Sequence, residues 1–454
     1  MNKYIKTIAL ATIATLSLTS TAQNTNSAYF MDGYNYRYQL NPAFGNEKNF
    51  ISIPGIGNIN AAMHGTIGLD DILYNIDGKT TTFLNPAVDA SFINDLDDVS
   101  RLGSNINVNV LSIGFHGLKG YNTISVNVKS NFNTRIPKTL FSLLKENIEN
   151  KSYDISDFNS HADVYGEIAL GHSHQINQKW RIGATVKFLL GGANVDADFE
   201  KAQLTLGEDA WTAVTNAKVQ ASIKGLEYER DINKDTGHEY VNGMDVDGAG
   251  LNGFGMALDL GLQFSPNDNL SLSAAVLDLG YINWNNNMVA STGGEKTFTT
   301  DKYSFSVNDD ATNSFDNEWE LLQNDLSALY ELEDEGDKGS RSKTLGATLN
   351  VGAEYAIPAY RKLKFGLLNS TRFQGDYTWT EFRLSANINP RKAFSAGANV
   401  AVGTYGWSFG WLMNINTTGF NMFLGMDHTM GKLAKQGIPL SSNASVNMGI
   451  NIPF

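Results

Sequence analysis

The chain contains no cysteine, so it has no disulfide, no thiolate metal site and no lipid-modified cysteine. Basic residues are also in deficit, because 34 Lys and Arg face 47 Asp and Glu and give a formal net charge of −13. Nucleic-acid binding needs clustered cations that neutralise phosphates, so this balance argues against that class of function. After the N-terminal segment, no run of about 18 apolar residues occurs, which excludes a membrane-spanning helix there.

The N-terminus has the pattern of a secretory signal peptide. Lys3 and Lys6 precede an apolar run at 8–18, and the small residues of Ser20-Thr21-Ala22 follow. We therefore expect residues 1–22 to be removed on export. An exported chain that enters a membrane without helices must do so as a closed barrel, because lipid offers no partner to unpaired backbone groups.

Segments of alternating apolar and polar residues recur along the chain. Most are about 10–15 residues long, which exceeds the usual soluble strand and suits a tilted membrane strand. They lie at 50–65, 106–117, 122–133, 161–176, 180–199, 254–264, 270–284, 344–357, 363–373, 379–389, 393–404, 407–416, 420–427 and 445–454. Their polar faces are rich in Gly, Ser and Asn with isolated charges, which fits a barrel lumen better than bulk water.

Loop lengths predict the topology. If the C-terminus lies on the periplasmic side, the turns at 118–121, 177–179, 265–269, near 358, 390–392 and 417–419 all fall on that side and the long connections lie outside, as in outer-membrane barrels. The long connections are 67–104, 134–159, 200–252, 285–342 and 428–443. We predict an all-β fold, a closed antiparallel transmembrane barrel of about 14 strands, with 12 or 16 as alternatives.

The last ten residues alternate strictly and end in Phe454. This pattern resembles the terminal strand by which bacterial outer-membrane barrels are recognised and closed. It implies contact with the barrel-assembly machinery during biogenesis. Taken alone, the segment would also fit the last strand of a soluble sandwich.

Two groups of motifs resemble a known family. Asn41-Pro42-Ala43 ends an aromatic-rich stretch before the first strand, and paired Asp-Leu-Gly motifs contain Asp259 and Asp278. On these residues the chain resembles an uncharacterised branch of Bacteroidota outer-membrane barrels related to the long-chain fatty-acid transporter (FadL-like, PorV/PorP-like). The resemblance implies a lumenal plug at 23–47 before a barrel at 48–454. An unstructured periplasmic tail is the alternative.

The two aspartates are candidates for a lumenal site. Asp259 lies on the polar face of its strand, whereas Asp278 shares its parity with apolar residues. We infer a β-bulge near 276–277 that turns Asp278 inward beside Asp259. The pair could bind a cation or a polar head group, or could pair with a lumenal cation such as Arg383, whose strand also carries Glu381.

Tryptophans mark several strand ends. Trp284 ends the second Asp-Leu-Gly strand and completes the predicted lumenal set. Together with Trp180, Trp379 and Trp407 it also fits an aromatic girdle at the membrane interface.

Two outer segments have helical spacing. Phe141 and Leu144 share one face after Pro137, a favoured first helical residue, and Trp319 and Leu322 share one face within an acidic loop. By resemblance, such helices form an outer capture site for hydrophobic ligands. Alternatively, they pack on one another as a lid.

Metal and catalytic signals are weak. Asp231, Asn233 and Asp235 imitate the start of a calcium loop, but Thr236 and Asn242 replace the glycine and glutamate that the loop needs. We expect no metal and no cofactor. No Ser/His/Asp arrangement stands out, so we do not expect an enzyme.

Our leading hypothesis is an outer-membrane barrel of a Gram-negative bacterium that transports or binds small hydrophobic or amphipathic ligands. The alternative is a non-transporting accessory subunit of a secretion, gliding or barrel-assembly complex, with other outer-membrane proteins as partners. A continuous apolar pocket would favour transport. A lumen blocked by charge pairs, with an apolar surface patch, would favour the subunit.

Overall fold

The computed structural model describes residues 25–145, 151–207, 210–234, 236–248, 250–303, 315–429 and 443–454. The predicted signal peptide, Asp235 and most of the connection at 428–443 lie outside these residues.

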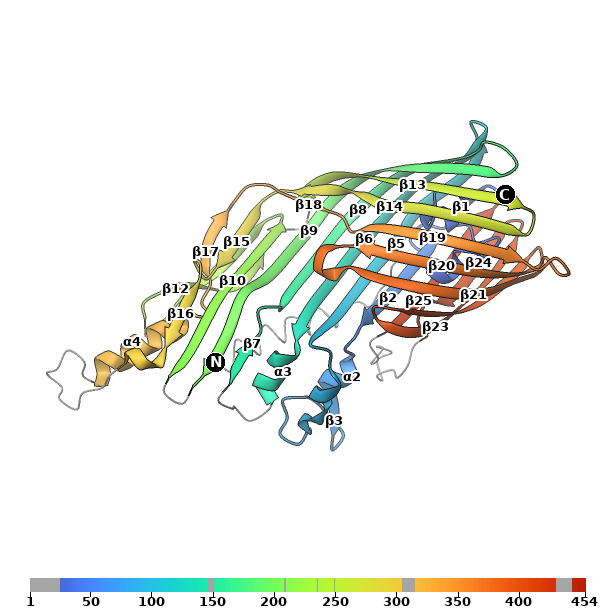
Figure 1. Ribbon diagram of the computed structural model, residues 1–454. Helices are drawn as coiled ribbons and strands as arrows, with labels where there is room; N and C mark the ends of the chain where they lie inside the picture. Colours follow the sequence, from blue (N-terminus) through green and yellow to red (C-terminus); the bar gives the residue numbers. More distant parts are fainter. Residues whose placement is uncertain are drawn as a thin grey trace.

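Within the described residues, fourteen antiparallel strands close into a barrel, as predicted (Figure 1). In wall order they are β1 (Phe50–Ser52) with β2 (Asn58–Gly65), β5 (Val99–Gly117), β6 (Gly120–Pro137), β8 (Asn159–Gln175), β9 (Trp180–Leu206), β13 (Gly253–Asn267), β14 (Leu270–Trp284), β18 (Arg341–Thr344) with β19 (Ala347–Ala356), β20 (Leu363–Phe373), β21 (Trp379–Arg391), β22 (Phe394–Gly403), β23 (Gly406–Thr417), β24 (Phe420–Met426) and β25 (Ala444–Pro453). The barrel closes where β25 pairs with β1 and β2, from Phe50↔Pro453 to Met63↔Ala444.

Side-chain alternation produces an apolar outer belt. Exposed apolar residues occur on nearly every strand, among them Val128, Leu170, Ile182, Met256, Leu367, Leu384, Phe409 and Leu424. A barrel with such a belt has the fold of Gram-negative outer-membrane barrels. The turns after β5, β8, β13, β19, β21 and β23 lie at the end of the barrel that holds the C-terminus, which we assign as the periplasmic end (right in Figure 1). The connections 374–378 and 404–405 are also short, but they lie at the opposite end.

The girdle prediction is wrong for two of its four tryptophans. Trp180 and Trp407 are exposed, but Trp284 and Trp379 are buried. Trp284 packs against Gly191, a position where an added Cβ would lie 2.6 Å from its ring. Because Gly191 has no side chain, it leaves room for the Trp284 ring to be buried instead of facing lipid.

On one side the wall continues far beyond the barrel (Figure 1). The distal half of β9 pairs with β10 (Trp211–Ile223), and β10 pairs with β15 (Asn287–Ser291) and β16 (Lys296–Thr299). β17 (Glu333–Asp337) pairs with β15, and the hairpin of β11 (Leu226–Ile232) and β12 (Glu239–Val246) packs beside β17. We call this sheet, with β7 (Ser152–Asp154), the extracellular wing. The segments 200–252 and 285–342, predicted as loops, therefore contain strands, although these strands add none to the barrel.

The remaining outer elements form two separate groups. α2 (Leu69–Ile72), β3 (Leu73–Ile76), β4 (Lys79–Thr82), η3 (Ala90–Asp95) and α3 (Lys138–Lys145) gather around a buried cluster that includes Phe83 and Phe141. α4 (Phe315–Ala328) lies instead at the distal end of the wing, beside β16 and close to η4 (Thr300–Lys302) in the chain (Figure 1). The two helices therefore do not form a shared lid. No described helix is long and apolar enough to cross a membrane.

Candidate functional site

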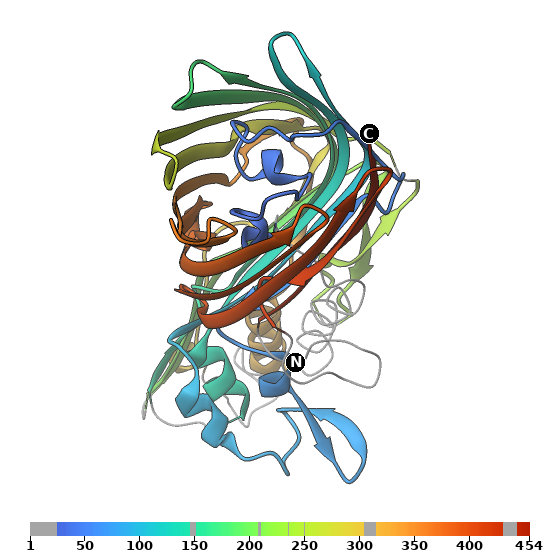
Figure 2. The same ribbon diagram turned by 90° about the vertical axis from the view of Figure 1, so that its right-hand side faces the viewer.

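The N-terminal segment, residues 25–49, lies inside the barrel (Figure 2). It contains two short 3-10 turns, η1 (Asn26–Ala28) and η2 (Arg37–Gln39). Its aromatic residues are buried against one another and against inward residues of the wall. This core comprises Ala28, Tyr29, Phe30, Met31, Tyr34, Tyr36, Tyr38, Leu40 and Phe44 of the segment with Phe50, Leu368, Leu412 and Phe423 of the barrel. Leu412, the one apolar residue on the polar face of its strand, thus has a partner inside the lumen.

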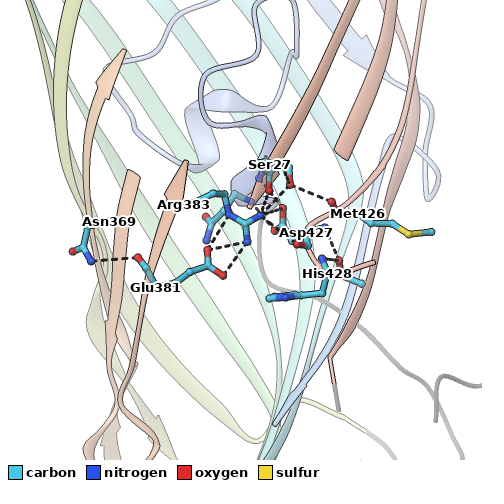
Figure 3. Close-up of polar contacts among 10 residues, drawn as sticks. Ser27, Asn369, Glu381, Arg383, Met426, Asp427 and His428 are labelled. Carbon is cyan, nitrogen blue, oxygen red and sulfur yellow. Dashed lines mark hydrogen bonds and ion pairs between the residues drawn. The ribbon is translucent and has the colours of Figure 1, made fainter. Parts of the chain in front are cut away.

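One carboxylate holds the start of the segment (Figure 3). The backbone amides of Asn26 and Ser27 donate to Oδ2 and Oδ1 of Asp427, at 2.8 and 2.6 Å. The Ser27 hydroxyl donates to the carbonyl of Met426 at 3.1 Å and accepts from the Asn399 amide at 2.9 Å. A carboxylate that accepts the first free amides of a helical turn is a strong cap, because both donors would otherwise be buried without a partner.

We call the contact between Asp427 and the amides of Asn26 and Ser27 the anchor, and Arg383 lies next to it (Figure 3). Its Nε and Nη2 donate to the two oxygens of Glu381 at 2.9 Å each, in the bidentate geometry that suits a buried guanidinium. Its Nη1 donates to the Asp427 carbonyl at 3.2 Å and lies 4.0 Å from the Asp427 carboxylate. Arg383 therefore pairs with Glu381 and supports the anchor, and it is not the partner of Asp259.

The Asn41-Pro42-Ala43 motif fixes the segment to the opposite wall. The Asn41 amide donates to the carbonyls of Leu262 and Ala274, at 3.3 Å each, and its Oδ1 accepts from the amide of Ala43. Gly183 permits this approach, because an added Cβ there would lie 2.1 Å from the Pro42 carbonyl oxygen.

Asp259 and Asp278 do meet, and the predicted bulge brings them together. Leu277 and Asp278 oppose the single residue Asp259, with Asp278 at φ 57°, and the Asp278 amide donates to Asp259 at 2.7 Å. The cation between the carboxylates is Lys187, whose Nζ lies 2.7 Å from Asp259 and 2.6 Å from Asp278.

Two further lumenal residues complete this buried network. Lys129 lies 2.7 Å from Glu167 and 3.6 Å from Asp278, and Lys187 lies 3.7 Å from Glu167. Sequence reasoning missed Lys129, Glu167 and Lys187. Lys187 could have been found, because it lies on the inward face of β9, two residues from Thr185, which pairs with Asp259. The aspartates are thus engaged in ion pairs within the wall.

The barrel mouth is bridged above this network. Asp196 accepts from His161 at 2.7 Å and from Lys343 at 2.5 Å, and it lies 2.7 Å from Arg341. From η5 (Gly375–Tyr377), the Tyr377 hydroxyl donates to Asn159 at 2.6 Å. Burial raises the pKa of the Tyr377 phenol, which keeps it protonated as a donor. These contacts join β18 and the β20–β21 connection to β8 and β9.

A small cavity remains beside the anchor. Its volume is about 40 Å³, and its lining includes Asn26, His64, Glu381, Tyr405 and Asp427. Sites for small-molecule ligands typically have about 300–1,000 Å³. This cavity is therefore an order of magnitude smaller than an ordinary ligand pocket.

Other predicted site residues lie elsewhere. Trp284 packs in a wall cluster with Tyr165, Leu189, Ala257 and Ile282. Phe141 is buried and Leu144 packs beside it, while Leu322 of α4 is half-buried and the side chain of Trp319 lies outside the described part of the chain.

The calcium-like sequence folds as a hairpin turn. Asn233 accepts from the amide of Thr236 and donates to Glu331, while Asp231 accepts from the amide of Ile232. Asp235 is outside the described residues. Within those residues, no group of three His, Cys, Asp or Glu side chains is placed to hold a metal ion.

Comparisons place the chain among known sequences and structures. The model of a family described as a family of unknown function (DUF5723) matches residues 42–427, and no curated protein matches. Similar solved structures include the Pseudomonas putida toluene transporter TodX, at 9% identity, 96% of each chain and a TM-score of 0.41. The Ralstonia pickettii toluene transporter TbuX gives 7% identity, 95% of this chain, 94% of the other and a TM-score of 0.41. A Pseudomonas aeruginosa FadL homologue gives 10% identity over 95% of this chain and 98% of the other, with a TM-score of 0.38.

Proposed function

This chain belongs to a family of unknown function (DUF5723), and we propose that it is an outer-membrane barrel kept closed by its own N-terminal segment. On this proposal it serves as a non-transporting accessory subunit of an outer-membrane assembly. The supporting observation is the occupied lumen, which contains an aromatic core and paired charges and in which the cavity beside Asp427 has a volume of only about 40 Å³.

Displacing the segment would be costly. It would expose an aromatic core to water and leave the carboxylate of Asp427 and the guanidinium of Arg383 with fewer partners. Because so many contacts hold the segment in the lumen, the barrel is suited to keep one fixed shape. The extracellular wing then becomes the part available to other proteins, because it extends the wall well beyond the membrane-spanning strands (Figure 1).

Two experiments test the proposal, one on conductance and one on complex formation. In planar bilayers, we expect the purified wild-type barrel to be closed and a variant lacking residues 25–44 to conduct. In native outer membranes, we expect the wild type to be extracted in a stoichiometric complex, and a variant with the wing hairpin 226–246 removed to be extracted alone. Wild-type channels as active as those of the truncated variant, or a wild type that is always extracted alone, would contradict the proposal.

A second candidate function is the gated transport of small hydrophobic or amphipathic molecules. It is favoured by one observation, the position of the small cavity directly beside the anchor, with the aromatic residues Trp379 and Tyr405 in its lining. A ligand that displaced Asn26 from Asp427 would enlarge this cavity into the lumen. Lauric acid serves as the probe: a lauric-acid-dependent rise in wild-type conductance supports transport, and unchanged conductance supports the closed subunit.

A further inference from the structure

A groove lies where the extracellular wing leaves the barrel. Its volume is about 440 Å³, and it is lined by Lys224, Leu251, Asn252, Asn285, Asn286, Gly339 and Ser340. These residues come from the turn after β10, the entry to β13, the bend between β14 and β15, and the bend between β17 and β18. The groove is thus a crease at the junction between the barrel and the wing.

Asparagines hold the crease in shape. The Asn252 amide donates to the Asn285 carbonyl at 2.7 Å, and its Oδ1 accepts from Asn286 at 3.2 Å. The backbone amide of Asn287 donates to the Gly339 carbonyl at 2.9 Å. The floor is therefore preorganised, which lowers the ordering cost of binding.

Three polar groups in the crease have no assigned partner. Among the described residues, none makes a hydrogen bond or ion pair with the ammonium of Lys224, the side-chain amide of Asn285 or the hydroxyl of Ser340. An ammonium, an amide and a hydroxyl together match the phosphate and hydroxyl groups of a phosphorylated sugar. The exposed Leu251 adds an apolar surface for the carbon face of a sugar ring.

The crease continues the lipid-facing surface of the barrel. Asn285 has the parity of Tyr281 and Leu279 on β14, and both of these residues are exposed, as is Phe254 near the start of β13. β13 has 15 residues, whereas a membrane strand needs about 9–11, so its extracellular end and the crease lie just above the hydrocarbon layer. A molecule with its acyl chains on the belt would place its head group in the crease.

We propose that this crease binds the phosphorylated sugar head group of an outer-leaflet glycolipid, with the acyl chains against Phe254, Leu279 and Tyr281. Lys224 pairs with a phosphate, while Asn285 and Ser340 bind sugar hydroxyls. The site lies on the outer wall, so it does not depend on whether the lumen opens.

The experiment uses the full-length barrel purified from native membranes, with native mass spectrometry as the readout. We expect wild-type protein to retain lipopolysaccharide, and the variant K224A/N285A/S340A to retain about tenfold less, because one charge-assisted hydrogen bond contributes at least about 1.4 kcal/mol. The control Lys392→Ala removes an exposed lysine at the periplasmic turn between β21 and β22 and should retain the wild-type amount. Heat-dependent gel mobility reports whether each variant is a folded barrel.

Titration of delipidated protein distinguishes the source of the ligand. We expect binding of deep-rough lipopolysaccharide that the triple variant lacks and that Lys224→Arg preserves. The proposal is overturned if the triple variant retains as much lipopolysaccharide as the wild type. It is also overturned if wild-type protein binds phosphatidylglycerol vesicles as tightly as it binds deep-rough lipopolysaccharide. Binding of lipid-free core oligosaccharide as tight as that of the glycolipid also overturns it, because the acyl chains would then contribute nothing.

Discussion

The contact between Asp427 and the N-terminal segment gives the sharpest test of how the lumen is closed. Asp427→Ala removes the acceptor of two backbone amides, those of Asn26 and Ser27. Each buried donor left without a partner costs about 1–3 kcal/mol, so the docking of the segment should weaken by about 2–6 kcal/mol. Since about 1.4 kcal/mol corresponds to a factor of ten, opening of the segment should become at least about 30-fold more frequent.

Hydrogen exchange in the folded, detergent-solubilised barrel measures this opening. Amides at 25–40 should exchange at least about 30-fold faster in the variant, while those of β5 and β6 stay protected. Asp427→Asn keeps one acceptor oxygen and should give an intermediate rate. The control Asp268→Ala removes an exposed carboxylate at the β13–β14 turn and should change nothing. Unchanged protection in a folded Asp427→Ala barrel would refute the reasoning and would show that the aromatic core alone holds the segment.

Three further predictions concern stability and fit. Gly183→Ala should displace the Asn41-Pro42-Ala43 motif and raise protease sensitivity near residue 43, whereas Gly166→Ala, where the added Cβ meets Leu190 at an ordinary 3.7 Å, should behave as wild type. Lys187→Met should lower the free energy of unfolding in urea by about 3–5 kcal/mol, because Asp259 loses its cation, and Lys187→Met with Asp259→Asn should recover most of that loss. Arg383→Met should cost a similar amount by leaving Glu381 buried and unpaired, and adding Glu381→Gln should restore stability; equal effects of the single and double variants would contradict both statements.

Much of the barrel could be predicted from the sequence because its determinants are local. Alternation of period two places one residue set toward lipid, and short turns fix which strands are neighbours. The predicted segment 407–416, for example, lies within β23, with Trp407, Phe409 and Met413 exposed and Leu412 inside.

The wing could not be predicted in the same way. β9 continues for 27 residues, and its two halves pair with different partners, β13 near the membrane and β10 beyond it. Outside the lipid, both faces of a strand can be partly polar, so the alternation weakens and acidic strands such as β17 look like loops.

The lumenal site shows which contacts a sequence can and cannot specify. The broken parity around Asp278 was a local signal, and it located the bulge that joins Asp278 to Asp259. The partner cation, Lys187, has no such signal in the sequence next to the aspartates. Choosing it requires the pairing of β13 with β9, on the edge of β13 opposite to β14.

Arg383 was the wrong choice for a geometric reason. β21 lies four strands from β13 along the wall, which at ~4.8 Å per strand is about 19 Å, and the N-terminal segment occupies the space between them. Each of these two charges therefore pairs with a residue closer to it. Glu381 and Arg383 do so two residues apart on one strand, and Asp259 and Lys187 do so on adjacent strands. Separation along the wall does not by itself exclude a pair, because Lys129 on β6 and Asp278 on β14 are also four strands apart and yet lie 3.6 Å from each other. Assigning a lumenal pair therefore requires both the wall order and the position of the segment that fills the lumen.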